Sequence, residues 1–467
     1  MEKQLFSGAA YRNVNPYKEV IDRLPGRDDT FIDNLHIRVI AVSDGEKKFL
    51  LIAYESGYNY IHEQFSAIYE RFGIPEEQVM IFDCHSHTKL YGEREGRSTE
   101  NPRKRFHLFS EWPQEEQDAM REYGLFARAK MLEAVEEALA NLRPARMGHA
   151  KGESYVNVCR NQRYVIEQPD GTLKEHYTVG VDPTTPIDHT VFVMKFEDIK
   201  TGEPIAFFIN YPVHNCVVIG NKAGKNGDRA WSSDLGGNCS QYMEAKYPGC
   251  VAMWSSGPAA NINPIICNQV MYPDPMTGAP KRYYPKENEL ALASLKLLSA
   301  RHFADIMETV RKIDHMTDKT TMKCAIEMSE TPGLDGENVI HEGLYKVRMQ
   351  TFRIGDVALL GVSGELYDSF GKLIREISPL KDTVIVTHCA FGVVISEYIL
   401  DDWVFEHSAS PEERMSMGPR DQKEGWVGVQ LPNLADCIIG TEHSQIVPGY
   451  LADSFTRHTL SIFDKIL

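Results

Sequence analysis

Short apolar runs separated by amphipathic stretches set the elements expected for this chain. Residues 34–43 and 48–54 are rich in Val, Ile, Leu and Phe and flank an Asp-Gly pair, which predicts a β-hairpin. Residues 58–72 carry apolar side chains at spacings of three and four, which predicts an amphipathic helix. The apolar run 79–82 follows a Gly-Ile-Pro turn and predicts a buried strand.

The rest of the chain continues this mixture of strands and helices. Residues 89–116 are polar and charged and predict a long loop, either a lid or a surface excursion. We expect one α/β catalytic domain over residues 1–467, with mixed β-sheets flanked by helices. The remaining predicted helices are 117–142, one ending near Tyr247, 286–312 and 366–377, and the remaining predicted strands are 190–196, 204–211, 251–254, 320–328, 345–353, 357–361 and 383–389.

Composition narrows the class of protein. A hydrophobic fraction of 42% and a charged fraction of 25% are typical of a globular chain. The formal charge of −16 argues against nucleic acid and anionic membranes as partners. We expect no membrane insertion and a cytoplasmic location, because no apolar stretch approaches 18 residues and the N-terminus lacks the features of a signal peptide. Nine cysteines without a short repeated spacing indicate reduced thiols.

Three predicted strands end in residues that can bind a metal ion. The strand 79–82 leads to His85 and His87, which project to the same side if the chain stays extended. Two such imidazoles can share one ion, or one can bind it while the other handles a proton, or both can be satisfied by backbone carbonyls. Two further strands lead to His214 and Glu365. Two imidazoles and one carboxylate suit a catalytic zinc with an open position.

In order and rough spacing, several segments between about residues 35 and 405 resemble the neutral (non-lysosomal) ceramidase family. Asp83-Cys-His-Ser-His-Thr88 is similar to the family's Thr-His-Thr-His, and Asn210-Tyr-Pro-Val-His214 is similar to its Asn-Tyr-x-x-His. The other matching segments are Ser232-Ser-Asp234, Ser256-Gly-Pro-Ala-Ala-Asn-Ile-Asn-Pro264, and Gly364-Glu365 followed by Tyr398.

The resemblance implies a Zn²⁺ ion bound by His85, His214, Glu365 and Tyr398. It also implies that His87 stabilises an oxyanion or moves a proton. This chemistry is sound, because zinc lowers the pKa of bound water to about 7 and polarises an acyl carbonyl. An imidazole with an unperturbed pKa of about 6.5 can donate to a tetrahedral intermediate or protonate a leaving amine.

The resemblance also assigns residues that would contact substrate. Arg163 lies in a stretch similar to the family's Asn-Arg-Arg and would anchor a carboxylate or an oxyanion, although the neighbouring Arg160 is open to the same role. Asn263 stands where ceramidases have a serine, and it can orient substrate but cannot be a nucleophile. Near Tyr398 the sequence departs from the family's pattern, because Leu400 stands near where the family usually has proline. We also expect no C-terminal immunoglobulin-like domain.

These observations favour a zinc-dependent amidohydrolase that cleaves the C–N bond of a small soluble amide by metal-activated water. Esters and lactones would use the same site. A second class is a non-catalytic relative that keeps the pocket and binds a metal or ligand. A third makes Cys84 or Cys216 a nucleophile, against the commoner role of buried cysteine as a small apolar residue. A homo-oligomer is left open.

Overall fold

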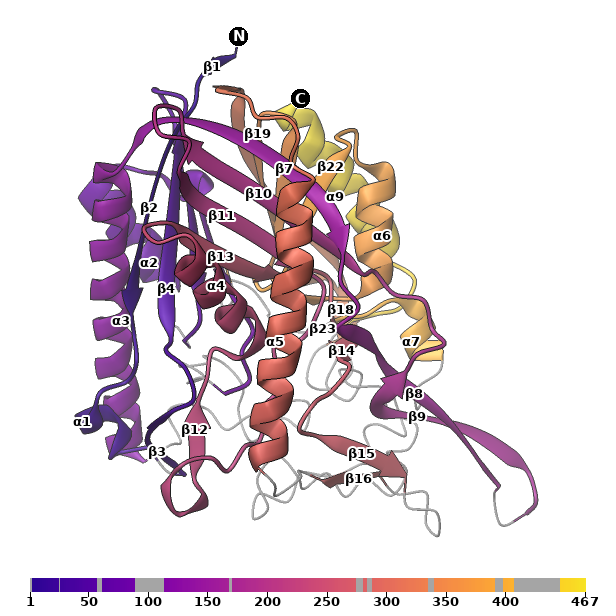
Figure 1. Cartoon of the computed structure of the whole chain (residues 1–467). Coiled ribbons are helices and arrows are strands. Elements are labelled where there is room, and N and C mark those ends of the chain that lie inside the picture. The colour runs from indigo at the N-terminus through magenta and orange to yellow at the C-terminus, as the bar shows by residue number, and fades with distance from the viewer. Residues whose placement is uncertain are drawn as a thin grey trace.

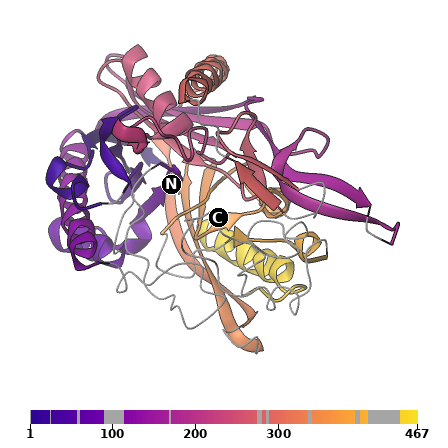
Figure 2. The same cartoon turned by 90° about the horizontal axis from the view of Figure 1, so that it is seen from below.

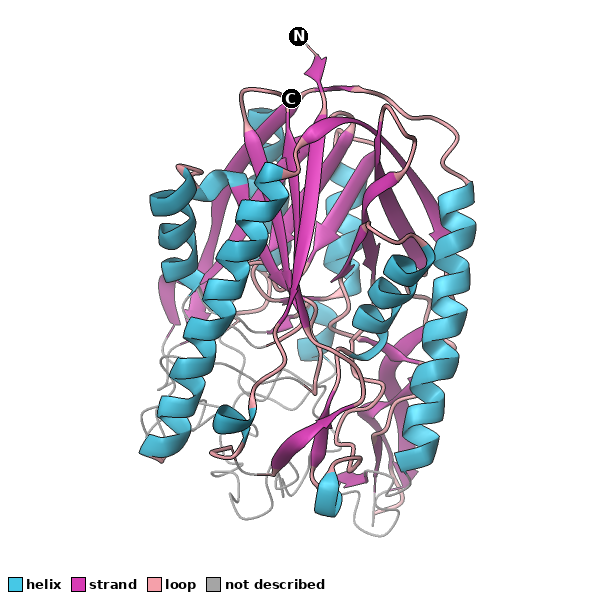
Figure 3. Ribbon diagram, turned by 60° about the vertical axis from the view of Figure 1, so that its left-hand side comes forward, coloured by secondary structure: helices cyan, strands magenta, loops and turns pink. Residues whose placement is uncertain are grey.

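Two β-sheets lie face to face at the centre of the molecule, and helices cover their outer faces (Figures 1 and 3). This arrangement confirms the expected α/β class with mixed sheets and flanking helices. The structure is a computed structural model, and it describes residues 2–24, 26–56, 61–88, 113–167, 170–273, 280–283, 288–334, 340–390, 398–406 and 446–467.

The larger sheet consists of eight strands. They are β2 (Phe6–Asn13), β4 (His36–Ser43), β5 (Lys48–Tyr54), β6 (Val79–Asp83), β7 (Arg143–Glu153), β10 (Thr190–Asp198), β11 (Pro204–Tyr211) and β13 (Val251–Ser256). Their spatial order is β13-β11-β10-β7-β2-β4-β5-β6. The two edge strands, β13 and β6, run parallel to their neighbours, whereas the other pairs are antiparallel. The sheet is therefore mixed, and the parallel edges carry the strand ends of interest.

The smaller sheet contains β18 (Met322–Leu334), β19 (Ile340–Ile354), β20 (Val357–Val362) and β22 (Asp382–Val386), in that order. Its last pair, β20 and β22, is parallel. The minor strands are β1 (Lys3–Gln4), β3 (Arg27–Phe31), β8 (Asn157–Glu167), β9 (Leu173–Asp182), β12 (Arg229–Trp231), β14 (Ile262–Pro264), β15 (Val270–Pro273), β16 (Pro280–Tyr283), β17 (Lys319–Thr320), β21 (Glu365–Leu366) and β23 (Tyr398–Ile399).

Helices form the outer layers. They are α1 (Lys18–Ile21), α2 (Ile61–Phe72), α3 (Gln114–Ala140), α4 (Asp234–Lys246), α5 (Asn288–Arg311), α6 (Asp368–Ile377), α7 (Asp402–Glu406) and α9 (Leu451–Ile466). Short 3-10 turns occur at Glu76–Gln78 and Lys225–Gly227. α3 packs on β2 and β4, α9 packs on β18 and β19, and α4 and α5 cover β13, β10 and β7.

Alternate residues of the central strands face different cores, as strand geometry requires. In β4, Ile40 packs between the two sheets, whereas Val39 packs in the core beneath α3. In β20, Leu359 faces the core between the sheets and Leu360 faces the core beneath α6 and α9. Because the two faces of each sheet pack in different cores, the molecule has four layers in the order helix, sheet, sheet and helix. The strands that lead to the site are therefore packed on both faces.

The expected hairpin, the strand before His85 and the main helices are all present. The expected strand 383–389 ends earlier, at Val386, and α3 begins at Gln114 instead of residue 117. Residues 89–112 of the expected long loop lie outside the described residues. No helix in the described part of the chain combines the length and apolar composition needed to cross a bilayer. The single-domain assignment, the cytoplasmic location and a homo-oligomer stay predictions.

Candidate metal centre

Polar residues follow four strands of the two sheets and meet at one place. His85 comes two residues after β6, and His214 comes three residues after β11. From the smaller sheet, Glu365 comes three residues after β20, and His388 comes two residues after β22. Each follows a strand whose described residues are almost all buried, which is where α/β proteins commonly bind ligands.

Backbone hydrogen bonds join these segments to one another. The N–H of Asp83 donates to the carbonyl of His388 at 3.3 Å, and the N–H of His388 donates to the carbonyl of Gly364 at 3.1 Å. The N–H of His87 donates to the carbonyl of Asn215 at 3.1 Å. The positions of the side chains are therefore set by the backbone of both sheets.

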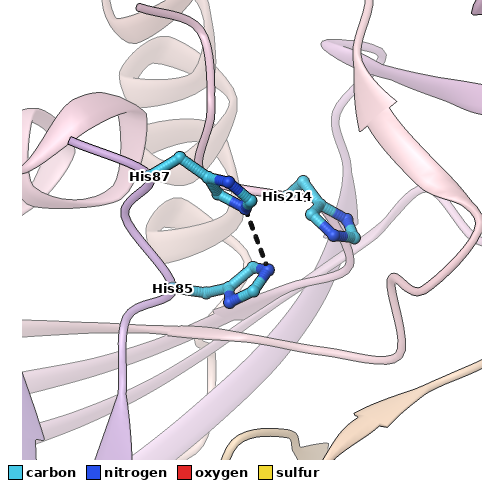
Figure 4. A group of neighbouring side chains, drawn as sticks. All are labelled: His85, His87 and His214. Atoms are coloured by element: carbon cyan, nitrogen blue, oxygen red, sulfur yellow. Dashed lines mark hydrogen bonds between the residues drawn. The ribbon is translucent and has the colours of Figure 1, made fainter. Parts of the chain in front are cut away.

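The histidines after β6 converge with His214, as Figure 4 shows. The Nε2 atoms of His85 and His87 lie 3.2 Å apart, and the ring centroids of His85 and His214 lie 4.7 Å apart. From the sequence, His85 and His87 were expected to lie on the same side of an extended chain. That reason was wrong, because the chain is not extended here. β6 ends at Asp83, and His85 has a left-handed φ of 59°, so a turn brings the two rings together.

His214 is fully buried and oriented for binding through one nitrogen. Its Nδ1 donates to the carbonyl of Ile262 at 3.0 Å, so its Nε2 carries the lone pair that could bind an ion. Burial and the positive charge of Arg160 lower the pKa of His214 below its usual value. Both effects favour the neutral imidazole that metal binding requires.

Glu365 supplies the carboxylate. Its Oε2 lies 3.2 Å from Nε2 of His214 and 3.7 Å from Nε2 of His85. Burial would raise the pKa of Glu365, but its hydrogen bond and charge interaction with His214, and then the charge of His388, hold that pKa well below its usual range. The group is therefore an ionised carboxylate that could bind a metal ion.

Tyr398 lies beside this cluster. β21 and β23 run parallel, and Glu365 pairs with Tyr398 in their register. The ring of Tyr398 is 6.5 Å from the ring of His214, centroid to centroid. Its role as a ligand stays a prediction, although the expected neighbourhood is present.

Of the two candidate arginines, the structure brings Arg160 and not Arg163 to the cluster. The Nη1 of Arg160 lies 3.1 Å from Nε2 of His214 and 3.4 Å from Oδ1 of Asn263. Arg160 is 4% exposed, and its Nε and Nη2 have no hydrogen-bond partner among the described residues. Arg163 pairs with Glu175, and its side chain is 54% exposed.

The difference between the two arginines comes from strand pairing. Arg160 lies where β8 begins beside β14, whereas Arg163 lies farther along, where β8 pairs with β9. Figures 1 and 2 show this β8–β9 hairpin extending away from the two sheets. The third residue assigned to substrate, Asn263, lies in β14 and is buried beside Arg160.

The segment Ser232-Ser-Asp234 is not part of the cluster of candidate ligands, but it forms hydrogen bonds with the loops that carry them. Asp234 accepts the N–H groups of Val217 and Val218 at 2.9 and 3.0 Å, which fixes the loop that carries His214. The carbonyl of Ser232 accepts hydrogen bonds from Ser86 and Thr88 at 2.8 and 2.7 Å. This segment therefore orients the loop after β6, which carries His85, and the loop after β11, which carries His214.

Sequence reasoning missed His388. Its ring stacks on the ring of His85, with centroids 3.9 Å and planes 14° apart, and its nearest nitrogen lies within 4.8 Å of ligand atoms of His85 and Glu365. The signal was present, because Thr387-His388 follows a buried strand as His85 does. A further group that could hold an ion lies elsewhere and consists of His149 in β7, Asp356 just before β20 and Asp382 at the start of β22.

No family model matches the sequence, and no curated protein matches it either. Solved structures do match. A crystal structure of the neutral ceramidase from Pseudomonas aeruginosa shares 14% identity over 100% of this chain and 74% of that chain, with a TM-score of 0.62. The chain has a neutral-ceramidase-like fold.

A second solved structure, a ceramidase complexed with C2, gives the same picture, with 13% identity, coverage of 99% of this chain and 75% of that chain, and a TM-score of 0.62. The resemblance read from the sequence is thus confirmed for the neutral-ceramidase-like fold. At such identities the likeness extends to the fold alone, so the chemistry of this chain has to be argued from its own residues.

Proposed function

We propose that this protein is a zinc-dependent hydrolase that cleaves a C–N amide bond at the cluster of His85, His214 and Glu365. The observation that carries the proposal is the convergence of these three side chains from separate strand ends, with the Oε2 of Glu365 at 3.2 and 3.7 Å from the two Nε2 atoms. The two similar structures described above are of ceramidases, and the preference for an amide rests on that likeness.

The donor set fits zinc. A tetrahedral ion with bonds of about 2.0 Å separates its ligand atoms by roughly 3.3 Å, close to the distances between Glu365 and the two imidazoles. His85, His214 and Glu365 would hold the ion, and Tyr398 would complete the set. A zinc ion in such a site polarises a carbonyl and lowers the pKa of bound water to about 7.

Arg160 supports the proposal from the substrate side. Burial would lower its pKa, but Tyr398 and Glu365 raise it above the usual value, so the guanidinium stays charged. A buried N–H without an acceptor is costly, and an oxyanion that forms beside the cluster would accept from it. Asn263 would orient the acyl group through its amide, and His87 would donate to the oxyanion or to the leaving amine.

The surroundings of Cys84 and Cys216 argue against the alternative in which one of them is the nucleophile. Cys84 is buried, and its thiol donates to the carbonyl of Trp254 at 3.2 Å. A hydrogen bond with Cys267, together with burial, raises the pKa of the Cys216 thiol well above its usual value. A nucleophilic cysteine requires a thiolate, and these surroundings favour the thiol.

The test uses the whole chain purified with zinc and the same protein after removal of metal by a chelator. We expect about one zinc per chain, and hydrolysis of at least one member of a panel of short amides, esters, lactones and ceramide that is lost with the metal and restored by zinc. His87→Ala is expected to keep the metal and lose rate. Metal-independent hydrolysis would overturn the proposal, and a zinc-loaded protein that cleaves nothing would favour the binding-protein alternative.

The same panel addresses the substrate. Because the two similar structures described above are of ceramidases, a lipid amide is a natural candidate, and ceramide belongs in the panel. A small soluble amide stays the prediction, on the grounds of the formal charge of −16 and Asn263 in place of a serine. Efficient cleavage of ceramide would contradict that prediction and leave the zinc hydrolase proposal intact.

A further inference from the structure

His388 is a buried histidine of the metal centre to which the resemblance gives no role. It is 3% exposed and follows β22, the last strand of the smaller sheet. Its ring lies parallel to the ring of His85, with centroids 3.9 Å apart and planes inclined by 14°. The two residues are far apart in the sequence, so the contact depends on how the two sheets meet.

The backbone supports a dedicated position for this ring. Both His85 and His388 adopt the left-handed region, with φ values of 59° and 56°, which residues other than glycine rarely occupy. Such strain persists where surrounding structure imposes it, and it concentrates at functional sites. Here the N–H of His388 donates to Gly364, the residue before Glu365, and its carbonyl accepts from Asp83, two residues before His85.

Distance alone would admit His388 as a ligand, because its nearest nitrogen lies within 4.8 Å of ligand atoms of His85 and Glu365. The orientation of the rings argues otherwise. An imidazole binds a metal ion in its own plane, at about 2.0 to 2.1 Å from the nitrogen. Because the two rings are stacked face to face, an ion in the plane of His85 lies outside the plane of His388. The stacked pair therefore cannot share one ion.

We propose that His388 is a positioning residue of the metal centre, which fixes the plane of the His85 ring by stacking on it. The proposal rests on the proposed function, since it assumes that His85 binds zinc. Metal-binding histidines need a partner that sets their ring orientation, and loss of such a partner commonly weakens metal affinity by 10- to 100-fold. For His85 that partner is an aromatic face supplied by the other sheet.

The experiment separates stacking from coordination by ring chemistry. His388→Phe keeps an aromatic face and removes both nitrogens, His388→Leu keeps much of the volume without a ring plane, and His388→Ala removes the ring. Each whole-chain variant is loaded with Co²⁺, whose visible spectrum reports the ligand geometry, and the dissociation constant of zinc is measured by chelator competition. His189→Ala is the matched control, because the ring of His189 also packs on an aromatic ring, that of Tyr155, at 4.6 Å between centroids, and His189 belongs to none of the groups of described residues that could hold an ion.

We expect wild type, His388→Phe and His189→Ala to share one cobalt spectrum and one zinc affinity. His388→Leu and His388→Ala are expected to bind zinc about 10- to 100-fold more weakly, with an altered spectrum. If His388→Phe loses metal as fully as His388→Ala, His388 acts through a nitrogen and the inference is wrong. If His388→Leu and His388→Ala bind as wild type does, the stack positions nothing. A wild type that binds no metal would instead remove the proposed function itself.

Discussion

The first prediction concerns how the buried carboxyl group of Asp234 makes the stability of the fold depend on pH. This group accepts hydrogen bonds from the loop that carries His214. Asp234 is fully buried, and burial raises its pKa from the usual 3.8 to about 6. The folded state therefore binds this proton more tightly than the unfolded state, so stability falls as pH rises between about 4 and 6. Roughly two pKa units at about 1.4 kcal/mol each give a loss of about 3 kcal/mol over the whole window.

The perturbation that isolates this term is Asp234→Asn. Asparagine tolerates the left-handed φ of 58° at this position, and its amide oxygen still accepts the N–H groups of Val217 and Leu235, now bound by Oδ1 of the aspartate. It cannot accept the N–H of Val218 as Oδ2 does, which costs about 1 to 3 kcal/mol at every pH. The substitution thus lowers stability by a constant amount and removes the pH-dependent contribution of the carboxyl group.

The assay is urea unfolding of metal-free wild type and Asp234→Asn at pH 4.5 and pH 7.5. We expect the stability difference between the two proteins to change by about 2 kcal/mol across this range, in favour of the variant at the higher pH. The exposed Asp314→Asn is the control and should show no such change. Identical pH dependence in wild type and Asp234→Asn would refute the reasoning.

The remaining predictions concern the site itself. His85→Ala and His214→Ala are each expected to lose both metal and activity, measured by elemental analysis and turnover, and a fully zinc-loaded variant of either would exclude that ligand. Arg160→Met is expected to slow turnover by about 10²- to 10³-fold with metal retained, whereas Arg163→Met should leave the rate unchanged, so equal effects would contradict the placement of the two arginines. Asn263→Ala is expected to slow turnover by about 10²-fold without loss of metal, and an unchanged rate would show that it does not orient substrate.

Much of the site could be predicted because its determinants are local. Apolar runs mark β6, β11 and β20 as buried strands, and within three residues of their ends stand His85, His214 and Glu365. Buried strands have few alternative placements in an α/β protein, so their ends tend to meet. The local sequence pattern was sufficient to predict that these three side chains lie together.

The rest depends on contacts that no local pattern shows. Arg160 and Arg163 occupy the same strand, and only the pairing of β8 with β14 at one end and with β9 beyond it places the first in the site and the second at the surface. His388 was passed over because its strand was expected to continue to residue 389. The turn at His85 was also missed, since a left-handed histidine depends on surrounding hydrogen bonds and not on residue type.

The proposed ligands would link metal binding to the packing of the two sheets. His85 and His214 follow strands of the larger sheet, whereas Glu365 follows a strand of the smaller one. An ion bound by all three would cross-link the sheets at one end of the core they share. Any ligand that binds only the folded state stabilises it, by about 2.7 kcal/mol at a free concentration 100 times the dissociation constant. Without the ion, the N–H of Asp83 still donates to the carbonyl of His388, so a backbone hydrogen bond joins the two sheets at this end even when the metal is removed.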